Sequence, residues 1–350
     1  MINHILNSFG RRRLALATCV ILLLIMQLQA HSQQLATASL GGTVVDPTGL
    51  SISLATVTLT NPAQGTVRTF TTEKDGGFSY TNLAAGEYVL AVHGVAGFSD
   101  FHQSLILAVG QSLQLSAKLS VERARTQIEV TSGATSEVDT VNSVDGGVIG
   151  EHQISNLPLN GRNYLELSLL VPGNSPAPNF DPTKVNTVVI SSAGQVGRGS
   201  NVSIDGADNN DDVVGGSLVN IPEDAVQEFQ IATNRFSAAL GRSGSSVTNV
   251  VTRQGSNSIH GDAGVYERDK VLQGLPATYD PSIGATPAFH RQQYTGDVGG
   301  PIRQDKAWWF AAVEDRRQLG ADLVGVRNTA KKAIGRTFAT APLHDFLVCV

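Results

Sequence analysis

The fold of this chain is decided at Leu157-Pro158-Leu159-Asn160-Gly161-Arg162-Asn163-Tyr164. Proline stops a helix that approaches it from the N-terminal side, so the helix predicted over residues 149–157 ends before Pro158. Asparagine and glycine both accept the positive φ angles of tight turns, and Asn160-Gly161 therefore predicts a sharp reversal of the chain. The leucine-rich run Tyr164–Leu170 predicts a second short helix, buried within a compact domain.

A second ordered stretch follows about ninety residues later. It contains Gly241-Arg242-Ser243-Gly244 and then Val247-Thr248-Asn249-Val250-Val251-Thr252-Arg253-Gln254-Gly255. Together with the first stretch it resembles the plug of the TonB-dependent receptors, in the subgroup that carries a carboxypeptidase regulatory-like domain ahead of the plug. The resemblance covers about residues 39–317. It implies an outer-membrane transporter that works by displacement of its plug and not by catalysis.

Short β-branched runs between turn residues fill residues 33–121, as in Ala55–Thr60 and Tyr88–Val92. In the first run Val57 and Leu59 alternate with threonines, which predicts a strand with one buried face. The regular spacing of such runs is typical of a β-sandwich.

This region resembles the carboxypeptidase regulatory-like domain, a prealbumin-like sandwich of seven strands that is grouped with carbohydrate-binding-like folds. In that family Phe78, Tyr80, Tyr88 and Phe98 fall on core positions, so we interpret them as core residues and not as a sugar platform. The predicted fold class is therefore mainly β: the sandwich, a mixed α/β plug, and the incomplete start of a transmembrane β-barrel.

The N-terminus has the features of a secretory signal over residues 1–32. Three arginines at positions 11–13 precede the apolar run Leu14–Met26, and Ala30-His31-Ser32 offers small residues for cleavage. A run of about a dozen residues is shorter than the roughly 18 expected of a spanning helix, so a permanent anchor is the weaker alternative. Cys19 lies within the run and not at its end, which disfavours a lipoprotein.

Charge and composition exclude several functions. The chain beyond the leader has 22 basic and 30 acidic side chains, a formal charge of −8, which disfavours nucleic acid as a partner. Only Cys349 remains as a cysteine, so no intrachain disulfide is predicted. No zinc-peptidase, serine-hydrolase or nucleotide-loop motif occurs, so we predict neither an enzyme nor a cofactor. We interpret five scattered histidines as surface residues and not as metal ligands: His93, His102, His152, His260 and His290.

The linker, residues 122–132, contains a short strand-prone segment. It consists of Thr126, Gln127, Ile128, Glu129, Val130 and Thr131. The segment resembles a TonB box, which needs only extended backbone that can add a strand to a partner's sheet. The resemblance implies TonB as a partner. An ordinary linker or a first plug strand remains an equal alternative.

Within the plug, residues 133–255, the motif residues are Asn160, Gly161, Arg162 and Asn163. Arg162 could contact a substrate, but we favour a structural role in which its guanidinium pairs with loop carbonyls or with a carboxylate of the barrel wall. The segment Ile221–Ile231 resembles the helix-to-strand passage of the family, with Pro222 suited to the start of the helix.

Four acids fall within eight residues that begin at Asp205, in the turn of a strand and turn predicted at residues 202–206. They are Asp205, Asp208, Asp211 and Asp212. Their spacing does not match a calcium-binding loop, so we predict a polar loop at the plug apex that could contact substrate. Calcium or a cationic cargo is the lesser alternative, and no metal site is predicted.

Residues 256–317 alternate in the manner of membrane strands, at residues 260–267, 294–302 and 306–314. Trp308, Trp309 and Phe310 suit an interfacial aromatic girdle, and Gly299-Gly300-Pro301-Ile302 before Asp305-Lys306 resembles the tight periplasmic turn of the family. A plugged barrel needs about 22 strands, which these residues cannot supply. We therefore expect a truncated receptor, unpaired or wrongly paired strands beyond residue 256, and a divergent tail over residues 318–350.

These observations predict the N-terminal part of a TonB-dependent outer-membrane receptor for a bulky nutrient, either carbohydrate or peptide. Such a fragment would not itself transport, and it could remain in the periplasm. The alternative is a periplasmic or surface module that binds carbohydrate or mediates adhesion. A binding module has no need of the two plug stretches, so their presence favours the receptor.

Overall fold

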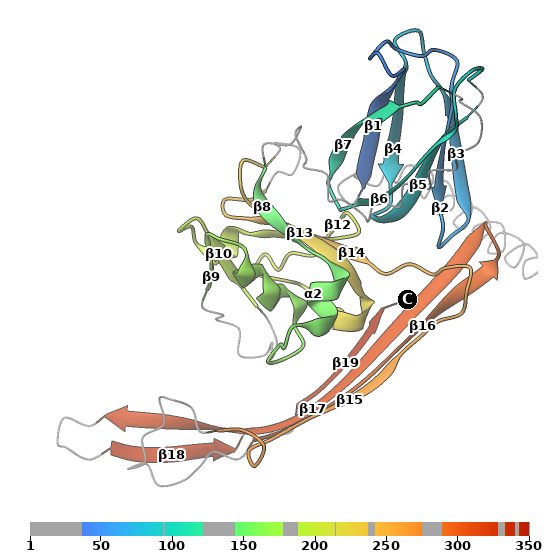
Figure 1. The fold of residues 1–350 in the computed structure, drawn as a ribbon. Helices are drawn as coiled ribbons and strands as arrows, with labels where there is room; N and C mark the ends of the chain where they lie inside the picture. Colours follow the sequence, from blue (N-terminus) through green and yellow to red (C-terminus); the bar gives the residue numbers. More distant parts are fainter. Residues whose placement is uncertain are drawn as a thin grey trace, which may run out of the picture. The chain divides into compact units, whose positions relative to one another are not determined.

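The computed structural model describes residues 37–93, 95–121, 144–177, 188–213, 215–236, 242–274, 289–327, 333–339 and 343–349, with side chains as far as residue 319. The leader, residues 1–32, and the TonB-box candidate Thr126–Thr131 lie outside these ranges. Figure 1 shows three regions rich in strands, which are described in chain order. Among the described residues, no helix has the length and apolar character needed to cross a membrane.

The first region is a sandwich of two sheets. One sheet has the order β4 (Gly77–Leu83), β1 (Ala38–Val45), β7 (Ser112–Lys118), in which β1 and β7 are parallel. The other has the order β3 (Thr66–Thr71), β2 (Thr56–Asn61), β5 (Gly86–His93), β6 (Phe101–Leu107), and all its neighbours are antiparallel. These seven strands, with the β-rich regions that follow, confirm the mainly β fold class.

The apolar residues that alternate with polar residues in the sequence form the core of the sandwich. Val57 and Leu59 are fully buried while the threonines between them face outward, as the period of a strand requires. Phe78, Tyr80 and Tyr88 are buried in the same core. The hydroxyl of Tyr80 donates to the carbonyl of Val57 at 2.8 Å, and burial raises the pKa of Tyr80 to about 12. These aromatic residues are therefore core residues, as predicted.

The second region is a mixed domain built on a five-stranded sheet. Its order is β12 (Ala207–Asp208), β11 (Asn201–Ile204), β14 (Val247–Thr252), β13 (Val226–Asn234), β8 (Asp145–Ile149). The remaining elements are α2 (Glu151–Asn156), the 3-10 helices η2 (Tyr164–Leu170), η3 (Gly197–Gly199) and η4 (Glu223–Ala225), and the small sheet of β9 (Asn174–Pro176) with β10 (Ile190–Ser192). Phe229 and Ile231 on β13 lie at its buried centre.

Two helix predictions need correction here. Ile149 ends strand β8, so the helix expected over residues 149–157 is limited to α2. The C-terminal end of this helix was predicted correctly. Leu157 is extended, as expected of the residue before a proline, and α2 ends before it. The run Tyr164–Leu170 is a 3-10 helix, in which Leu165 and Leu167 are buried while Leu169 and Leu170, at its end, are exposed.

The third region is a sheet of long antiparallel strands. β15 (Ala263–Asp269), β16 (Phe289–Arg303), β17 (Ala307–Arg327) and β18 (Ala333–Ala339) pair in that order, and β19 (Leu343–Cys349) also pairs with β17. The tight turn expected at residues 299–302 is not found there, because these residues belong to β16, and residues 304–306 form the turn that joins β16 to β17. The structure thus shows regular pairing where unpaired or wrongly paired strands were expected, and strands within the expected tail. Strands that follow one another along the chain satisfy each other's backbone groups without a closed barrel.

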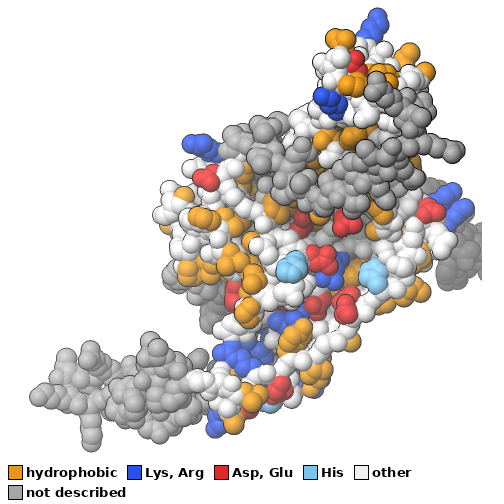
Figure 2. All heavy atoms as spheres, in the orientation of Figure 1, with side chains coloured by type: hydrophobic (Ala, Val, Ile, Leu, Met, Phe, Trp, Pro, Cys, Tyr) orange, Lys and Arg blue, Asp and Glu red, His pale blue; other side chains and the backbone are white. Residues whose placement is uncertain are grey.

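The two faces of this sheet differ in character. On β17 the buried positions Phe310, Ala312 and Glu314 alternate with exposed Trp309 and Val313. Figure 2 shows hydrophobic and charged side chains together on the visible face over these strands. A period of two with polar groups on one side is the pattern of a barrel wall.

We predict that residues 33–121 expressed alone unfold in one cooperative transition, because the turn residues, the alternation of apolar residues and the buried core all specify the same sandwich. Leu90→Ala should lower the free energy of unfolding by about 2–5 kcal/mol, since Leu90 is fully buried on β5. The control Ile106→Ala, at an exposed position of β6, should stay within about 0.5 kcal/mol of the parent. Thermal melts followed by circular dichroism measure both. A coil-like spectrum without a transition would contradict the prediction.

Candidate functional site

The loop Asn160–Asn163 takes a positive φ at a different residue from those predicted. Arg162 has a φ of 53°, in the left-handed region, whereas Asn160 and Gly161 do not have positive φ. The side chain of Asn163 accepts a hydrogen bond from the backbone N–H of Leu165 at 3.0 Å and so begins η2. The carbonyl oxygens of Asn160 and Gly161 accept hydrogen bonds from Arg291 and Gln293, both on β16. The plug loop is therefore held against the strand sheet.

Arg162 is the centre of this contact. Its Nη2 lies 2.6 Å from Oδ1 of Asp224, and its Nη1 lies 3.4 Å from Oε1 of Glu223, both on η4. Its Nε lies 3.6 Å from Oε2 of Glu314 on β17. The carboxylate partner on the strand wall that the sequence analysis favoured for Arg162 is therefore Glu314.

Aromatic and polar groups complete the surroundings of the guanidinium. Its central carbon lies 4.1 Å from the ring centroid of Tyr266 on β15, in cation–π geometry. Glu314 is further approached by Gln293 at 3.2 Å and by Arg316 at 3.5 Å. Tyr266 of β15 and Glu314 of β17 thus contact the Arg162 side chain, and Gln293 of β16 contacts Glu314.

Burial makes these charges interact strongly. The side chain of Arg162 is 9% exposed and that of Glu314 is 1% exposed. Burial raises the pKa of Glu223 to about 7, against the opposing attraction of Arg162. Burial also acts to lower the pKa of Arg162, but Glu223 and Asp224 outweigh it and the pKa is raised. Removal of one partner from such a cluster leaves an uncompensated buried charge.

Little apolar surface supports the same contact. Ala225 at the end of η4 packs with Phe310 and Ala312 of β17 in a small buried cluster. Pro222 precedes η4 as its N-terminal cap residue, and the acids Glu223 and Asp224 occupy its first turn. The short helix therefore presents its two carboxylates to Arg162 and its alanine to the strand.

The second motif carries the chain from the plug sheet to the strand sheet. A Cβ atom at Gly255 would lie 2.3 Å from the carbonyl oxygen of Trp309, so only glycine allows this approach. The side-chain oxygen of Asn257 accepts hydrogen bonds from the indole N–H of Trp308 at 2.8 Å and from the backbone of Asp305 at 2.9 Å. These residues fix the start of the strand sheet relative to the turn between β16 and β17.

The four predicted loop acids do not converge on one point. Asp205 lies apart from the others and accepts hydrogen bonds from the backbone and hydroxyl of Thr252, at 2.9 and 2.7 Å. Asp211 accepts from the backbone of Val213 at 2.8 Å and stabilises a turn. Asp208 and Asp212 both pair with Arg242, from the motif at residues 241–244. An arginine already compensates these two carboxylates, which disfavours calcium there.

A small polar cavity of about 130 Å³ adjoins this loop. It is lined by Arg198, Ser200, Asn210, Asp211, Asp212, Gly215, Gly216 and Arg242. The cavity has the size of a few water molecules. It is a place where polar groups of a larger ligand could bind, and not an enclosed ligand site.

Two family models match this chain. The carboxypeptidase regulatory-like domain matches residues 39–143, and an outer membrane β-barrel domain matches residues 251–337. The TonB-dependent transporter Oar of Myxococcus xanthus is 25% identical over 284 residues, which are 77% of this chain and 26% of Oar. The chain is therefore similar to a TonB-dependent transporter over most of its own length. It spans about a quarter of the length of the curated relative that it matches.

The similarity to Oar and the match to the barrel domain agree with the predicted outer-membrane localisation and non-enzymatic character. Among solved structures, the siderophore receptor PirA of Acinetobacter baumannii is 16% identical, with 51% of this chain and 24% of PirA covered and a TM-score of 0.33. The ferric enterobactin receptor PfeA of Pseudomonas aeruginosa is 15% identical, with 51% and 25% covered and a TM-score of 0.33.

The sequence predicted a structural role for Arg162 but did not identify its partners. Glu314 was read only as part of a strand, and Tyr266 had no assigned role. The signal was present in the alternation of β17, where Glu314 and Arg316 follow Phe310 and Ala312 on the buried face. A charged residue on the inward face of a strand is buried, and buried charged residues are almost always paired with an opposite charge.

We predict that Arg162→Ala lowers the free energy of unfolding by about 3–5 kcal/mol, because three buried or half-buried carboxylates lose their shared cation. Arg162→Lys should recover part of this, since a single ammonium cannot face all three. Arg242→Ala is the matched control: its side chain is 48% exposed, so we expect less than about 1 kcal/mol. Urea unfolding of the detergent-solubilised chain, followed by fluorescence of Trp308 and Trp309, measures these changes. Equal losses for Arg162→Ala and Arg242→Ala would contradict the prediction.

The raised pKa of Glu223 predicts a pH effect on stability. Between its ordinary value of 4.5 and about 7, the folded chain keeps a proton that the unfolded chain releases. The contribution of Glu223 to the free energy of unfolding therefore falls as pH rises through this window, by up to about 3 kcal/mol.

Glu223→Gln should remove this part of the pH dependence, which urea midpoints at pH 5 and pH 8 would show. Burial raises the pKa of Glu228 to about 7 as well, but its contribution is common to both proteins and cancels in the comparison. The control Glu151→Gln, at a side chain that is 61% exposed, should keep the slope of the parent. A parent-like slope in Glu223→Gln would refute the assignment.

Proposed function

We propose that this chain provides the sandwich, plug and first barrel strands of a transporter that takes up a bulky nutrient, carbohydrate or peptide, across the outer membrane. The plug blocks passage while Arg162 remains paired with Glu314. Displacement of the plug breaks this pairing and opens the path. The observation that carries the proposal is the ion-pair cluster that joins the plug loop and η4 to the inward face of β17.

The chemistry of the contact suits a part that must move. An interface of apolar side chains would expose its whole area to water on separation, at about 25 cal/mol per Å². Arg162, Glu223, Asp224 and Glu314 can instead exchange their partners for water, which solvates charges well. The plug can thus be held in one position and still be released by a modest pull.

The pull requires a partner that grips the chain ahead of the plug. We propose that TonB is this partner and that it binds Thr126–Thr131 by strand addition. Extended backbone offers free N–H and C=O groups, and the alternation of Ile128 and Val130 with polar residues suits an added edge strand. The position of this segment directly before the plug supports the proposal.

Substrate contact is proposed for the loop that carries Asp208, Asp211 and Asp212. Arg242, Asn210 and the adjoining cavity add donors and acceptors to these carboxylates. Such mixed polar surfaces recognise hydroxyl and amide groups, which both carbohydrates and peptides offer. Asp205 is not included, because its carboxylate is engaged with Thr252.

We predict that a peptide of residues 123–132 binds the C-terminal domain of a cognate TonB weakly. Ile128→Pro should abolish binding, because proline removes a ladder N–H and cannot occupy a paired strand. Titration calorimetry of the two peptides against the isolated TonB domain measures the difference.

Ile128→Val is the matched control, since it keeps the backbone donor and the β-branched character. It should bind within about twofold of the parent, as expected when main-chain hydrogen bonds dominate. Identical heats for the parent and proline peptides would reject the assignment of this segment.

A further inference from the structure

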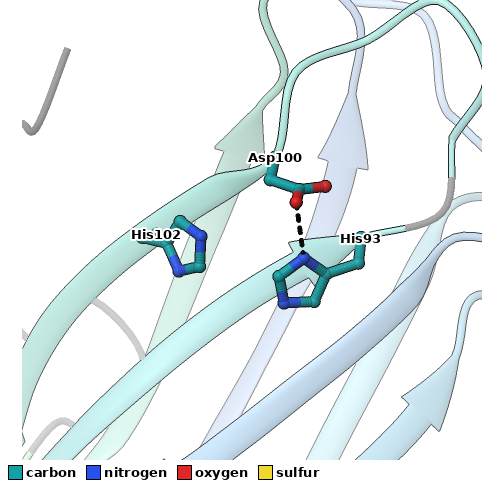
Figure 3. Close-up of side chains that lie close together, drawn as sticks. All are labelled: His93, Asp100 and His102. Atoms are coloured by element: carbon teal, nitrogen blue, oxygen red, sulfur yellow. Dashed lines mark ion pairs between the residues drawn. The ribbon is translucent and has the colours of Figure 1, made fainter. Parts of the chain in front are cut away.

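Three side chains of the sandwich lie together on the outer face of its four-stranded sheet. They are His93 at the end of β5, Asp100 directly before β6, and His102 within β6 (Figure 3). In the antiparallel register Val92 pairs with Phe101 and Ala91 with His102. His93 therefore comes opposite Asp100 and diagonal to His102, on the same face.

The fold holds these positions in place although the side chains are exposed. Val92, next to His93, is buried in the sandwich core, and Phe101, between Asp100 and His102, packs against it. The loop before Asp100 is anchored where the backbone N–H of Ser99 donates to the carbonyl of Ser120 at 2.8 Å. Each of the three residues is thus adjacent to a residue that the core or the ladder fixes.

The donor atoms are close enough to share one ion. Nδ1 of His93 lies 3.0 Å from Oδ2 of Asp100, and the rings of His93 and His102 have centroids 5.3 Å apart. One ligand atom from each residue lies within 4.8 Å of the others. Ligand atoms about 2.0–2.1 Å from a tetrahedral ion are separated by about 3.3 Å, so rotation of exposed side chains is enough to close the site.

We propose that His93, Asp100 and His102 form a binding site for a divalent transition-metal ion of the zinc class. Two imidazole nitrogens and one carboxylate oxygen are a ligand set that zinc accepts, and a fourth position stays open to water or to a further ligand. Calcium and magnesium prefer sets made of oxygen alone, so the two histidines select against them.

Two observations favour this site over a simple ion pair. A His–Asp pair accounts for His93 and Asp100 but gives no role to His102, whose ring stands edge-on beside that of His93. Within the ranges that the structure describes, these residues are the group of three metal-ligating side chains whose donor atoms approach one another. The acids of the plug loop differ, because Arg242 already occupies the place of a cation between Asp208 and Asp212.

The site is independent of the transport mechanism proposed above. Its residues belong to the sandwich and make no part of the Arg162 cluster. An exposed three-ligand site of this kind can bind a metal ion alone, or a metal ion that carries a ligand in the open position.

The test uses the full chain and zinc chloride in competition with a chromophoric chelator. We expect one zinc ion per chain to bind at this site, and His93→Ala, His102→Ala and Asp100→Asn each to weaken that binding at least tenfold. His152→Ala, which removes an exposed histidine on α2, is the matched control and should bind as the parent does.

Thermal unfolding supplies a second measurement that also checks the fold of each variant. All variants should melt near the parent without zinc, because the three side chains are exposed or half-exposed. Added zinc should raise the melting temperature of the parent and of His152→Ala, and should not raise that of His102→Ala or Asp100→Asn. The proposal is overturned if the parent binds no zinc, or if these variants bind and are stabilised as the parent is.

Discussion

The placement of a single buried guanidinium holds the second and third regions of this protein together. Arg162 is almost excluded from water, and a buried cation is tolerated only when carboxylates surround it. Those carboxylates come from η4 and from β17, and a tyrosine ring of β15 completes the enclosure. The positive φ of Arg162, the capping of η2 by Asn163 and the carbonyl contacts to β16 all serve to aim this side chain.

Different forces hold the different parts of the molecule. The sandwich core is made of fully buried aliphatic residues such as Leu59 and Leu90, whose separation would expose apolar surface. Among the described residues, the buried apolar cluster between η4 and the strands consists of Ala225, Phe310 and Ala312, and the charged groups around Arg162 lie in the same contact. Apolar burial suits a domain that stays intact, whereas a contact between charged groups can be exchanged for hydration. This division agrees with a transporter in which one part must move against another.

Much of the architecture was predictable from particular residues. The alternation of Val57 and Leu59 with threonines predicted the strand β2 and its buried face. The aromatic residues Phe78, Tyr80 and Tyr88 are core residues, as predicted. Pro158 correctly ended the preceding helix. The predictions that rested on hydrophobicity alone were wrong in part. Ile149 was expected in a helix but pairs in the sheet, and Leu169 and Leu170 were expected to be buried but face solvent on a 3-10 helix. Short apolar runs are ambiguous between strand and helix because tertiary contacts decide between them.

The sequence by itself indicated the resemblance to TonB-dependent transporters, the outer-membrane compartment and the order of the β-rich regions, because these depend on local patterns of residues. The tertiary structure alone decided which charges meet. Arg162 pairs with Glu314, and Asp205 accepts a hydrogen bond from Thr252 and lies apart from the other acids. The ring of His93 lies beside that of His102. Such pairings depend on strand register and on the packing of distant segments, and a one-residue shift in register would send every side chain to the opposite face.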